Sequence, residues 1–301
     1  MSQSFSPTQP LVEPTRRQWL TAASWALMGS GLGLGGAVQA QELFDLEKVR
    51  ASGILKVALY KDNAPYSDGK GQDMDGVDVA LAQALAQEMG LKLSLLPFDA
   101  GEKMDDDLRN MVWKGHYLGY GPADVMLHVP VDKFLMVENR QTLIFAPYSR
   151  EVLVIFHALD KLPAVKTGLD LQDLPLAAER ASGAASTLIG FGGGRLRSQV
   201  RIFNSGIEAA AAVIGGQVAA AYVSRAQAET ALKASGKSAS AFGMTQMTLP
   251  GLADNGWPIG MAVKSNNQQL AHALEAALQK IRADGRLLAM YRERGMTLVA
   301  P

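Results

Sequence analysis

A strand–helix–strand pattern between residues 53 and 98 most strongly constrains what this chain can fold into. The apolar run in GILKVALY predicts a buried strand, which the following Asn63-Ala-Pro65 breaks. GVDVALAQALAQEMG then has apolar residues at helical spacing, acidic residues at its start and Gly90 at its end. LKLSLLPF predicts a second strand. Because a crossover helix joins parallel neighbours, the pattern indicates an α/β fold with a parallel sheet.

The same alternation continues along the chain, so two α/β lobes are expected. ADVMLHVP predicts a third strand, and TLIFAPYSREVLVIF predicts a long extended run. A second series of strands and helices follows, before a last strand and a closing helical segment: LAAERAS, ASTLIGF, VRIFN, GIEAAAAVIGG, QVAAAYVS, WPIGMAVKS and NNQQLAHALEAALQKIRADGRLLAMYRERG. The 301 residues suffice for two cores. We expect residues 41–152 and 260–301 to form lobe 1 and residues 153–259 to form lobe 2.

The first 40 residues are typical of an export signal. Arg16 and Arg17 precede an uncharged, apolar and glycine-rich stretch, which ends in small residues at Val38 and Ala40. This predicts a twin-arginine signal peptide, residues 1–40, cleaved after Ala40, and a periplasmic protein. The alternative is a retained membrane anchor, because the uncharged stretch is long enough to span a bilayer. Its many Gly, Ala and Ser residues make it weakly apolar, which favours cleavage.

Charge and cysteine content exclude several classes of function. Basic and acidic residues both number 29, so no basic surface for nucleic acid is expected. Without cysteine the chain has no disulfide, thiolate metal site, cysteine nucleophile or lipoprotein anchor. DGKGQDMDGVD is a poor calcium loop, because starting it at Gly71 puts glycine and Ala82 at two ligand positions. No metal and no cofactor are expected.

Five segments, in chain order, carry a resemblance to a known family. They are SGILKVALYKDNAPY, MDGVDVALAQALAQEMGLKLSLLPFD, FAPYSREVLVIF, GIEAAAAVIGGQVAAAYVS and LAHALEAALQKIRADGRLLAMYRERG. They resemble the extracytoplasmic solute-binding proteins, family 3, that serve polar amino-acid ABC importers. The resemblance implies a two-lobed type II periplasmic binding protein fold, with a hinge between lobes that close over a small polar molecule. It further implies a membrane permease as partner and a monomeric binding protein.

The chain departs from this family where the family holds an amino acid. HVPVDKFLMVENRQTLIFAPY lacks the arginine of the family's T-x-x-R arrangement, which pairs with the ligand carboxylate. ASGAAST has Ala184 where the family has the threonine of a G-T turn, although neighbouring hydroxyls could substitute. VAAAYVS has Ala219 and Ser224 in place of two aspartates. We therefore expect a ligand other than a standard free amino acid, whose charges would be buried without partners.

In lacking this clamp, the chain resembles a branch of the fold that is associated with quinoprotein (pyrroloquinoline quinone) dehydrogenases. A ligand-less accessory protein of a periplasmic quinoprotein dehydrogenase is thus an alternative to a binding protein. A dehydratase-like enzyme is a further alternative. None of the four histidines has zinc-site spacing or a recognisable nucleophile partner, so no enzyme activity is expected.

Ligands of this fold bind at the carboxyl ends of strands, which selects the candidate contacts. His128 ends the third predicted strand, and Arg150, near the hinge, could supply the missing positive charge. Each has an alternative role. His128 could have its hydrogen bonds satisfied within the strand end, Arg150 could form a surface salt bridge, and Tyr66 could be a core residue. The predicted ligand-binding residues are Pro65, Tyr66, His128, Asp132, Arg150, Ser186 and Ser224.

Overall fold

The structure, a computed structural model, describes residues 45–247, 249–250 and 255–301. The predicted signal peptide lies outside the described residues. Across the described ranges, no helix combines the length and apolar character needed to cross a membrane.

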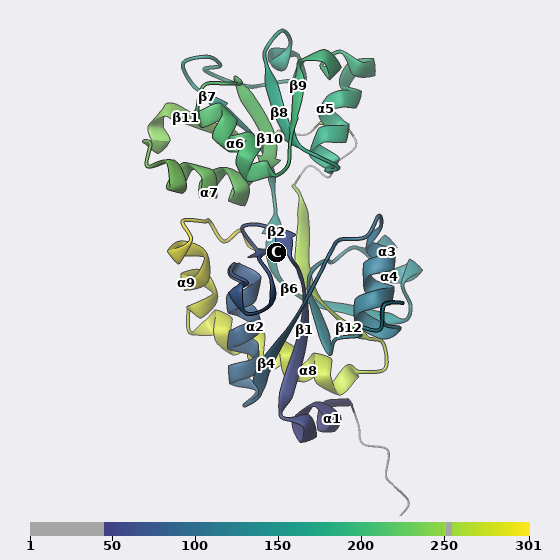
Figure 1. Ribbon diagram of the computed structural model, residues 1–301. Coiled ribbons are helices and arrows are strands. Elements are labelled where there is room, and N and C mark those ends of the chain that lie inside the picture. The colour runs from purple at the N-terminus through teal and green to yellow at the C-terminus, as the bar shows by residue number, and fades with distance from the viewer. Residues whose placement is uncertain (1–44, 248, 251–254) are drawn as a thin grey trace, which may run out of the picture. The chain divides into compact units, whose positions relative to one another are not determined.

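The first of two five-stranded sheets has the order β4-β1-β5-β12-β6 (Figure 1). Its strands are β1 (Ile54–Tyr60), β4 (Lys92–Phe98), β5 (Val125–Pro130), β6 (Thr142–Glu151) and β12 (Trp257–Lys264). β1 pairs in parallel with β4 and β5, whereas β12 pairs antiparallel with β5 and β6. The predicted strand–helix–strand unit is confirmed as β1, α2 (Val77–Glu88) and β4.

Helices cover both faces of this sheet, and alternate residues of β1 pack into a different hydrophobic core on each face. Val57 and Leu59 pack with apolar residues of α2, α8 (Gln268–Ala283) and α9 (Arg286–Glu293). Ala58 and Tyr60 pack with Leu108 and other residues of 104–113 on the opposite face. A strand buried on both faces needs a nearly continuous apolar sequence, as GILKVALY has. The remaining helices of this lobe are α1 (Asp45–Ser52), α3 (Met104–Leu108) and α4 (Lys133–Glu138).

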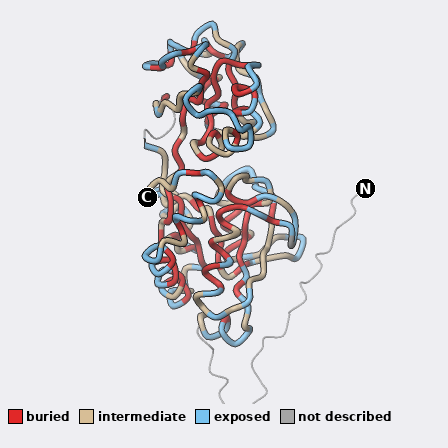
Figure 2. Tube along the Cα trace, turned by 90° about the vertical axis from the view of Figure 1, so that its left-hand side faces the viewer, coloured by how far each residue is buried: buried red, intermediate tan, exposed pale blue. Residues whose placement is uncertain are grey.

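The second sheet has the order β11-β7-β10-β8-β9. Its strands are β7 (Leu153–Ala158), β8 (Leu176–Glu179), β9 (Val200–Phe203), β10 (Ala220–Ser224) and β11 (Phe242–Thr245). One face packs against α6 (Gly206–Ile214) and α7 (Arg225–Ser235), and the other packs against α5 (Gly183–Gly194). The buried residues follow the strands of each sheet (Figure 2). A separate two-stranded ribbon joins β2 (Asp62–Asn63) to β3 (Ser67–Asp68).

The chain passes from the first sheet to the second between Glu151 and Leu153 and returns before Trp257. The two connections touch at Gly256, which has a φ of +66°. A Cβ atom at this position would lie 1.7 Å from the backbone oxygen of Glu151. Glycine is therefore required here for space as well as for backbone conformation.

Replacing Gly256 by alanine tests this close approach. Gly236 is the matched control, since it has a φ of +64° and a Cβ atom added there would meet nothing within 4 Å. Gly236→Ala should lower the free energy of unfolding by about 1–2 kcal/mol, the usual left-handed penalty. Gly256→Ala should lower it by about 3 kcal/mol or more, because the crossing backbone must also move. Urea denaturation measures both values, and equal losses would contradict the steric argument.

Candidate functional site

A cavity of about 510 Å³ is lined by residues from both five-stranded sheets and from the loops that follow their strands. Its volume is within the range usual for small-molecule sites. The polar residues that line it are Tyr60, Asp62, Asn63, Tyr66, His128, Glu151, Glu179, Ser182, Tyr222, Ser224 and Gln227.

Several of these polar residues lie at the ends of strands. Glu151 ends β6, Glu179 ends β8 and Ser224 ends β10. Ser182 lies in the turn after β8, where its side chain accepts a hydrogen bond from the N–H of Ala185 and caps α5. Carboxyl ends of strands are where open α/β sheets usually place ligands.

His128 is held at the cavity wall by a buried carboxylate. Its Nδ1 lies 2.7 Å from Oδ2 of Asp78, a residue with no exposed surface. The hydroxyl of Tyr148 donates to the other carboxylate oxygen at 2.7 Å and accepts a bond from the backbone N–H of His128 at 3.1 Å. Asp78 also occupies the first turn of α2, where the helix dipole favours a negative charge.

The protonation of His128 is shifted by this arrangement. Burial lowers the pKa of His128, but the charge and hydrogen bond of Asp78, together with the charge of Glu151, outweigh burial and raise the pKa overall. The imidazolium form is therefore favoured over a wider part of the neutral range than in a free histidine. Carboxylates on both sides of the ring stabilise that positive charge.

Glu151 is the second carboxylate beside His128, and it is less well satisfied. The residue is 9% exposed, and its Oε2 lies 3.9 Å from Nε2 of His128. This buried oxygen has no hydrogen-bond partner among the described residues. Burial raises the pKa of Glu151, while the charge of His128 and hydrogen bonds with Tyr66 and Ser224 act in the opposite direction. Glu151 lines the cavity, but Oε2 itself is enclosed by protein atoms beside the imidazole of His128.

Aromatic side chains supply much of the remaining wall. The Tyr66 ring is buried, with its centroid 4.4 Å from that of His128. The hydroxyl of Tyr60 donates to Asp107 at 2.9 Å, so its ring is fixed in place. Tyr222 and Trp257 line the cavity as well. Such rings combine apolar surface with a negative face that attracts cations.

Comparison with solved structures identifies this two-lobed architecture. An ancestral cationic amino acid solute binding protein has a TM-score of 0.64 and 18% identity, over 83% of this chain and 99% of that one. An amino acid ABC transporter substrate-binding protein from Streptococcus pneumoniae, bound to L-arginine, has a TM-score of 0.59 and 19% identity, over 85% and 100%. The chain has the type II periplasmic binding protein fold. The fold expected from the sequence is thus confirmed.

Sequence comparison adds one partial relative, and no family model matches the chain. The membrane-bound lytic murein transglycosylase F of Photobacterium profundum is 34% identical over 88 residues. That match spans 29% of this chain and only 16% of the transglycosylase. The link to quinoprotein dehydrogenases stays a prediction.

Three of the residues predicted to bind ligand line the cavity of this binding-protein fold. They are Tyr66, His128 and Ser224. Pro65 is not among the lining residues; it precedes Tyr66, and its carbonyl accepts a bond from the N–H of Val77 at 3.4 Å. The alternative of a core tyrosine also fits, because Tyr66 is both buried and at the cavity wall.

The other three predicted residues are placed elsewhere. Asp132 caps α4 by accepting bonds from the N–H groups of Phe134 and Leu135. Ser186 is exposed and donates to the carbonyl of Ser182. Arg150 precedes Glu151 on β6, so the two side chains point to opposite faces of the strand. Its guanidinium donates to the carbonyls of Ala300 and Asn255 instead.

The sequence analysis missed the two carboxylates that flank His128. In the sequence Asp78 indicates only an acidic helix start, yet it contacts a histidine 50 positions later. Glu151 directly precedes the apolar run VLVIF in FAPYSREVLVIF, which is an available signal for a buried carboxylate. No group of three potential metal ligands occurs in the part of the chain that the structure describes.

The raised pKa of His128 predicts how stability depends on pH. A raised folded-state pKa contributes stability that is present below the unfolded value, about 6.5, and is lost as pH rises through the folded value. The unfolding free energy should therefore be lower at about pH 8 than at about pH 6, and His128→Gln should reduce this difference. The raised pKa of Glu151 acts in the same direction.

His157→Gln is the control for this measurement. His157 is also buried, but its ring nitrogens contact the carbonyl of Leu162 and the hydroxyl of Thr245. Denaturation curves at the two pH values should show that this variant keeps the wild-type pH dependence. An unchanged pH dependence in His128→Gln would show that Asp78 does not shift the titration of His128.

Proposed function

We propose that this chain is a periplasmic solute-binding protein, which captures a small polar ligand and delivers it to the permease of an ABC-type importer. The observation that carries the proposal is the cavity itself, whose polar groups come from strand ends of both sheets. A ligand bound there would contact both lobes, and contact with both is what favours a closed form. The twin-arginine signal predicted for residues 1–40 supports export to the periplasm.

The lining residues favour a ligand other than a standard free amino acid. Within the part of the chain that the structure describes, they include no lysine and no arginine, so none of these side chains offers a fixed positive charge to an α-carboxylate. The backbone near the start of α5 is available, since Gly183 and Ala184 line the cavity. Its N–H groups suit a neutral acceptor such as a hydroxyl, because Glu179 lies at the end of the strand just before this turn.

Trp257 provides a direct optical probe of ligand binding. Trp19 and Trp25 lie in the predicted signal peptide, so the exported protein carries Trp113 and Trp257. Of these two, only Trp257 lines the cavity. In a Trp113→Phe variant, a bound solute should therefore change the emission of Trp257. The matched Trp257→Phe variant should bind with little change in emission, which separates cavity binding from effects elsewhere.

A screen of small polar solutes against the exported protein tests the function. A ligand at 100 times its Kd should add about 2.7 kcal/mol to the unfolding free energy, which raises the melting temperature by roughly 5–10 °C. A cavity ligand without turnover supports the binding protein. Absence of any such ligand, together with co-purification of a quinoprotein dehydrogenase, would favour the accessory role. Chemical conversion of the bound solute would favour the dehydratase-like enzyme.

A further inference from the structure

We infer that the ligand is a small organic cation without a carboxylate, and that its ammonium or guanidinium group binds Glu151. This inference rests on the proposed function, because it assigns a chemical class to the ligand of the same cavity. It follows from the charges of the wall, the position of the Glu151 carboxylate in it and the aromatic lining.

The charges of the cavity wall are predominantly negative. Asp62, Glu151 and Glu179 line it, and they come from β2, β6 and β8. Among the lining residues that the structure describes, His128 is the one side chain that can carry a positive charge, and its Nδ1 already faces Asp78. A wall of this composition attracts a cation and repels an anion.

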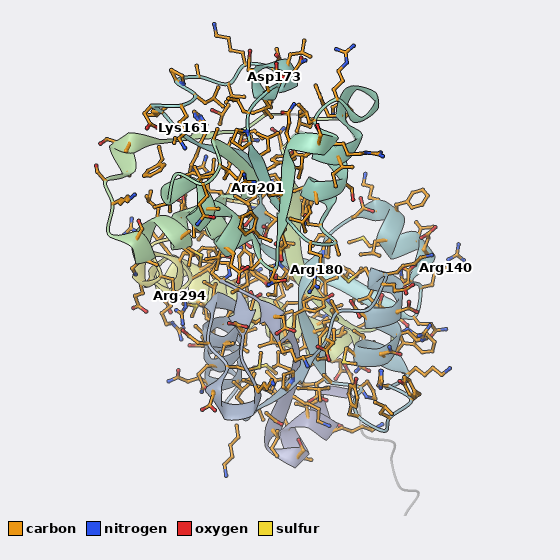
Figure 3. All side chains as sticks on the ribbon, turned by 45° about the horizontal axis from the view of Figure 1, so that its top comes forward. Arg140, Lys161, Asp173, Arg180, Arg201 and Arg294 are labelled. Atoms are coloured by element: carbon orange, nitrogen blue, oxygen red, sulfur yellow. The ribbon has the colours of Figure 1, made fainter. Side chains whose placement is uncertain are left out.

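None of the basic residues labelled in Figure 3, Arg140, Lys161, Arg180, Arg201 and Arg294, is among the described residues that line the cavity. Arg294 pairs with Asp75, whereas Arg201 and Lys161 donate to the carbonyls of Gln217 and Gly216. Arg180 directly follows the lining residue Glu179, but it is exposed and does not line the cavity. An incoming carboxylate would therefore lose its water and find, among the described lining residues, only the imidazole of His128, which is already paired with Asp78.

Glu151 has the binding capacity that a cationic donor needs. The residue lines the cavity, and its Oε2 has no hydrogen-bond partner among the described residues. That oxygen is enclosed beside the imidazole of His128, so the carboxylate has to rotate toward the cavity before a ligand N–H can reach it. An N⁺–H donor favours this rotation more than a neutral donor does, because charge-assisted hydrogen bonds are the stronger class.

The second sheet offers a complementary carboxylate. Oε2 of Glu179 accepts a bond from Nε2 of Gln227 at 2.8 Å, which fixes the side chain at the wall. Glu151 and Glu179 thus come from different lobes, so a cation near both would join the lobes electrostatically. The faces of Tyr222 and Trp257 add cation–π surface for an ammonium or guanidinium group.

Binding of such a cation is coupled to a proton. Burial raises the pKa of Glu151, and the groups that face it are His128, Tyr66, Ser224 and Asp78. A bound positive charge favours the ionised carboxylate, so part of the bound population must release a proton on binding. Affinity should therefore increase with pH through the range in which free Glu151 titrates.

Two pairs of probes isolate the role of the carboxylate. Agmatine is arginine without its carboxylate, and cadaverine is lysine without its carboxylate. Isothermal titration of the exported protein should show each amine binding at least about tenfold more tightly than its amino acid. Tighter binding of the amino acids, or binding confined to neutral or anionic solutes, would overturn the inference while the proposed function stands. Failure of every solute class would overturn both.

Glu151→Gln removes the proposed partner charge and keeps the shape of the side chain. It should weaken amine binding by at least about tenfold. Glu275→Gln is the control, because Glu275 is an exposed carboxylate of α8 outside the cavity and the change in net charge is the same. Equal affinity in wild type and Glu151→Gln would overturn the assignment of Glu151.

A measurement on the unmodified protein covers the case in which Glu151→Gln does not fold. Titrations in two buffers of different ionisation enthalpy report the protons exchanged on binding. Amine binding should release a fraction of a proton in the part of the range from about pH 5 to about pH 8 in which free Glu151 titrates. Proton uptake on amine binding, or no exchange at any pH from about 5 to about 8, would contradict the coupling to Glu151.

Discussion

The hydrogen bond between Asp78 and His128 is the interaction on which the geometry of the site depends. It joins α2 to β5, and Tyr148 extends the connection to β6. A buried carboxylate is unfavourable unless it is paired and hydrogen-bonded, so these partners cannot be removed singly without leaving a charge unsatisfied. The orientation of His128, and with it the positions of Tyr66 and Glu151, follows from satisfying Asp78.

The alternation of side chains along strands determines which residues reach the cavity. β6 ends with Arg150 and Glu151, and only the second is at the cavity wall. The same twofold period divides β1 between two cores. Neighbouring residues of one strand can thus lie on opposite faces, and between Arg150 and Glu151 that single step changes the sign of the charge at the wall.

Local patterns predicted the fold better than the site. The strand–helix–strand unit depends on periodicity within a few dozen residues, which the sequence displays directly. The contact of His128 with Asp78 depends on the packing of α2 against β5, and no local pattern encodes that distance. Likewise, α7 was not predicted, although Ser224 and Gln227 form its capping box, because Ser224 was considered only as a ligand contact.

The absent groups and the buried acceptor point to the same ligand class for different physical reasons. The lack of lysine and arginine among the described lining residues makes an anion unfavourable, but it does not by itself favour any other ligand. The carboxylate of Glu151 does, because this residue lines the cavity and an N⁺–H donor can pair with it on binding. His128 limits the repulsion between Asp78 and Glu151, which lets two carboxylates coexist beside one cavity. In this proposal, selectivity for a cation follows from the arrangement of His128, Asp78 and Glu151, which is already present in the ligand-free protein.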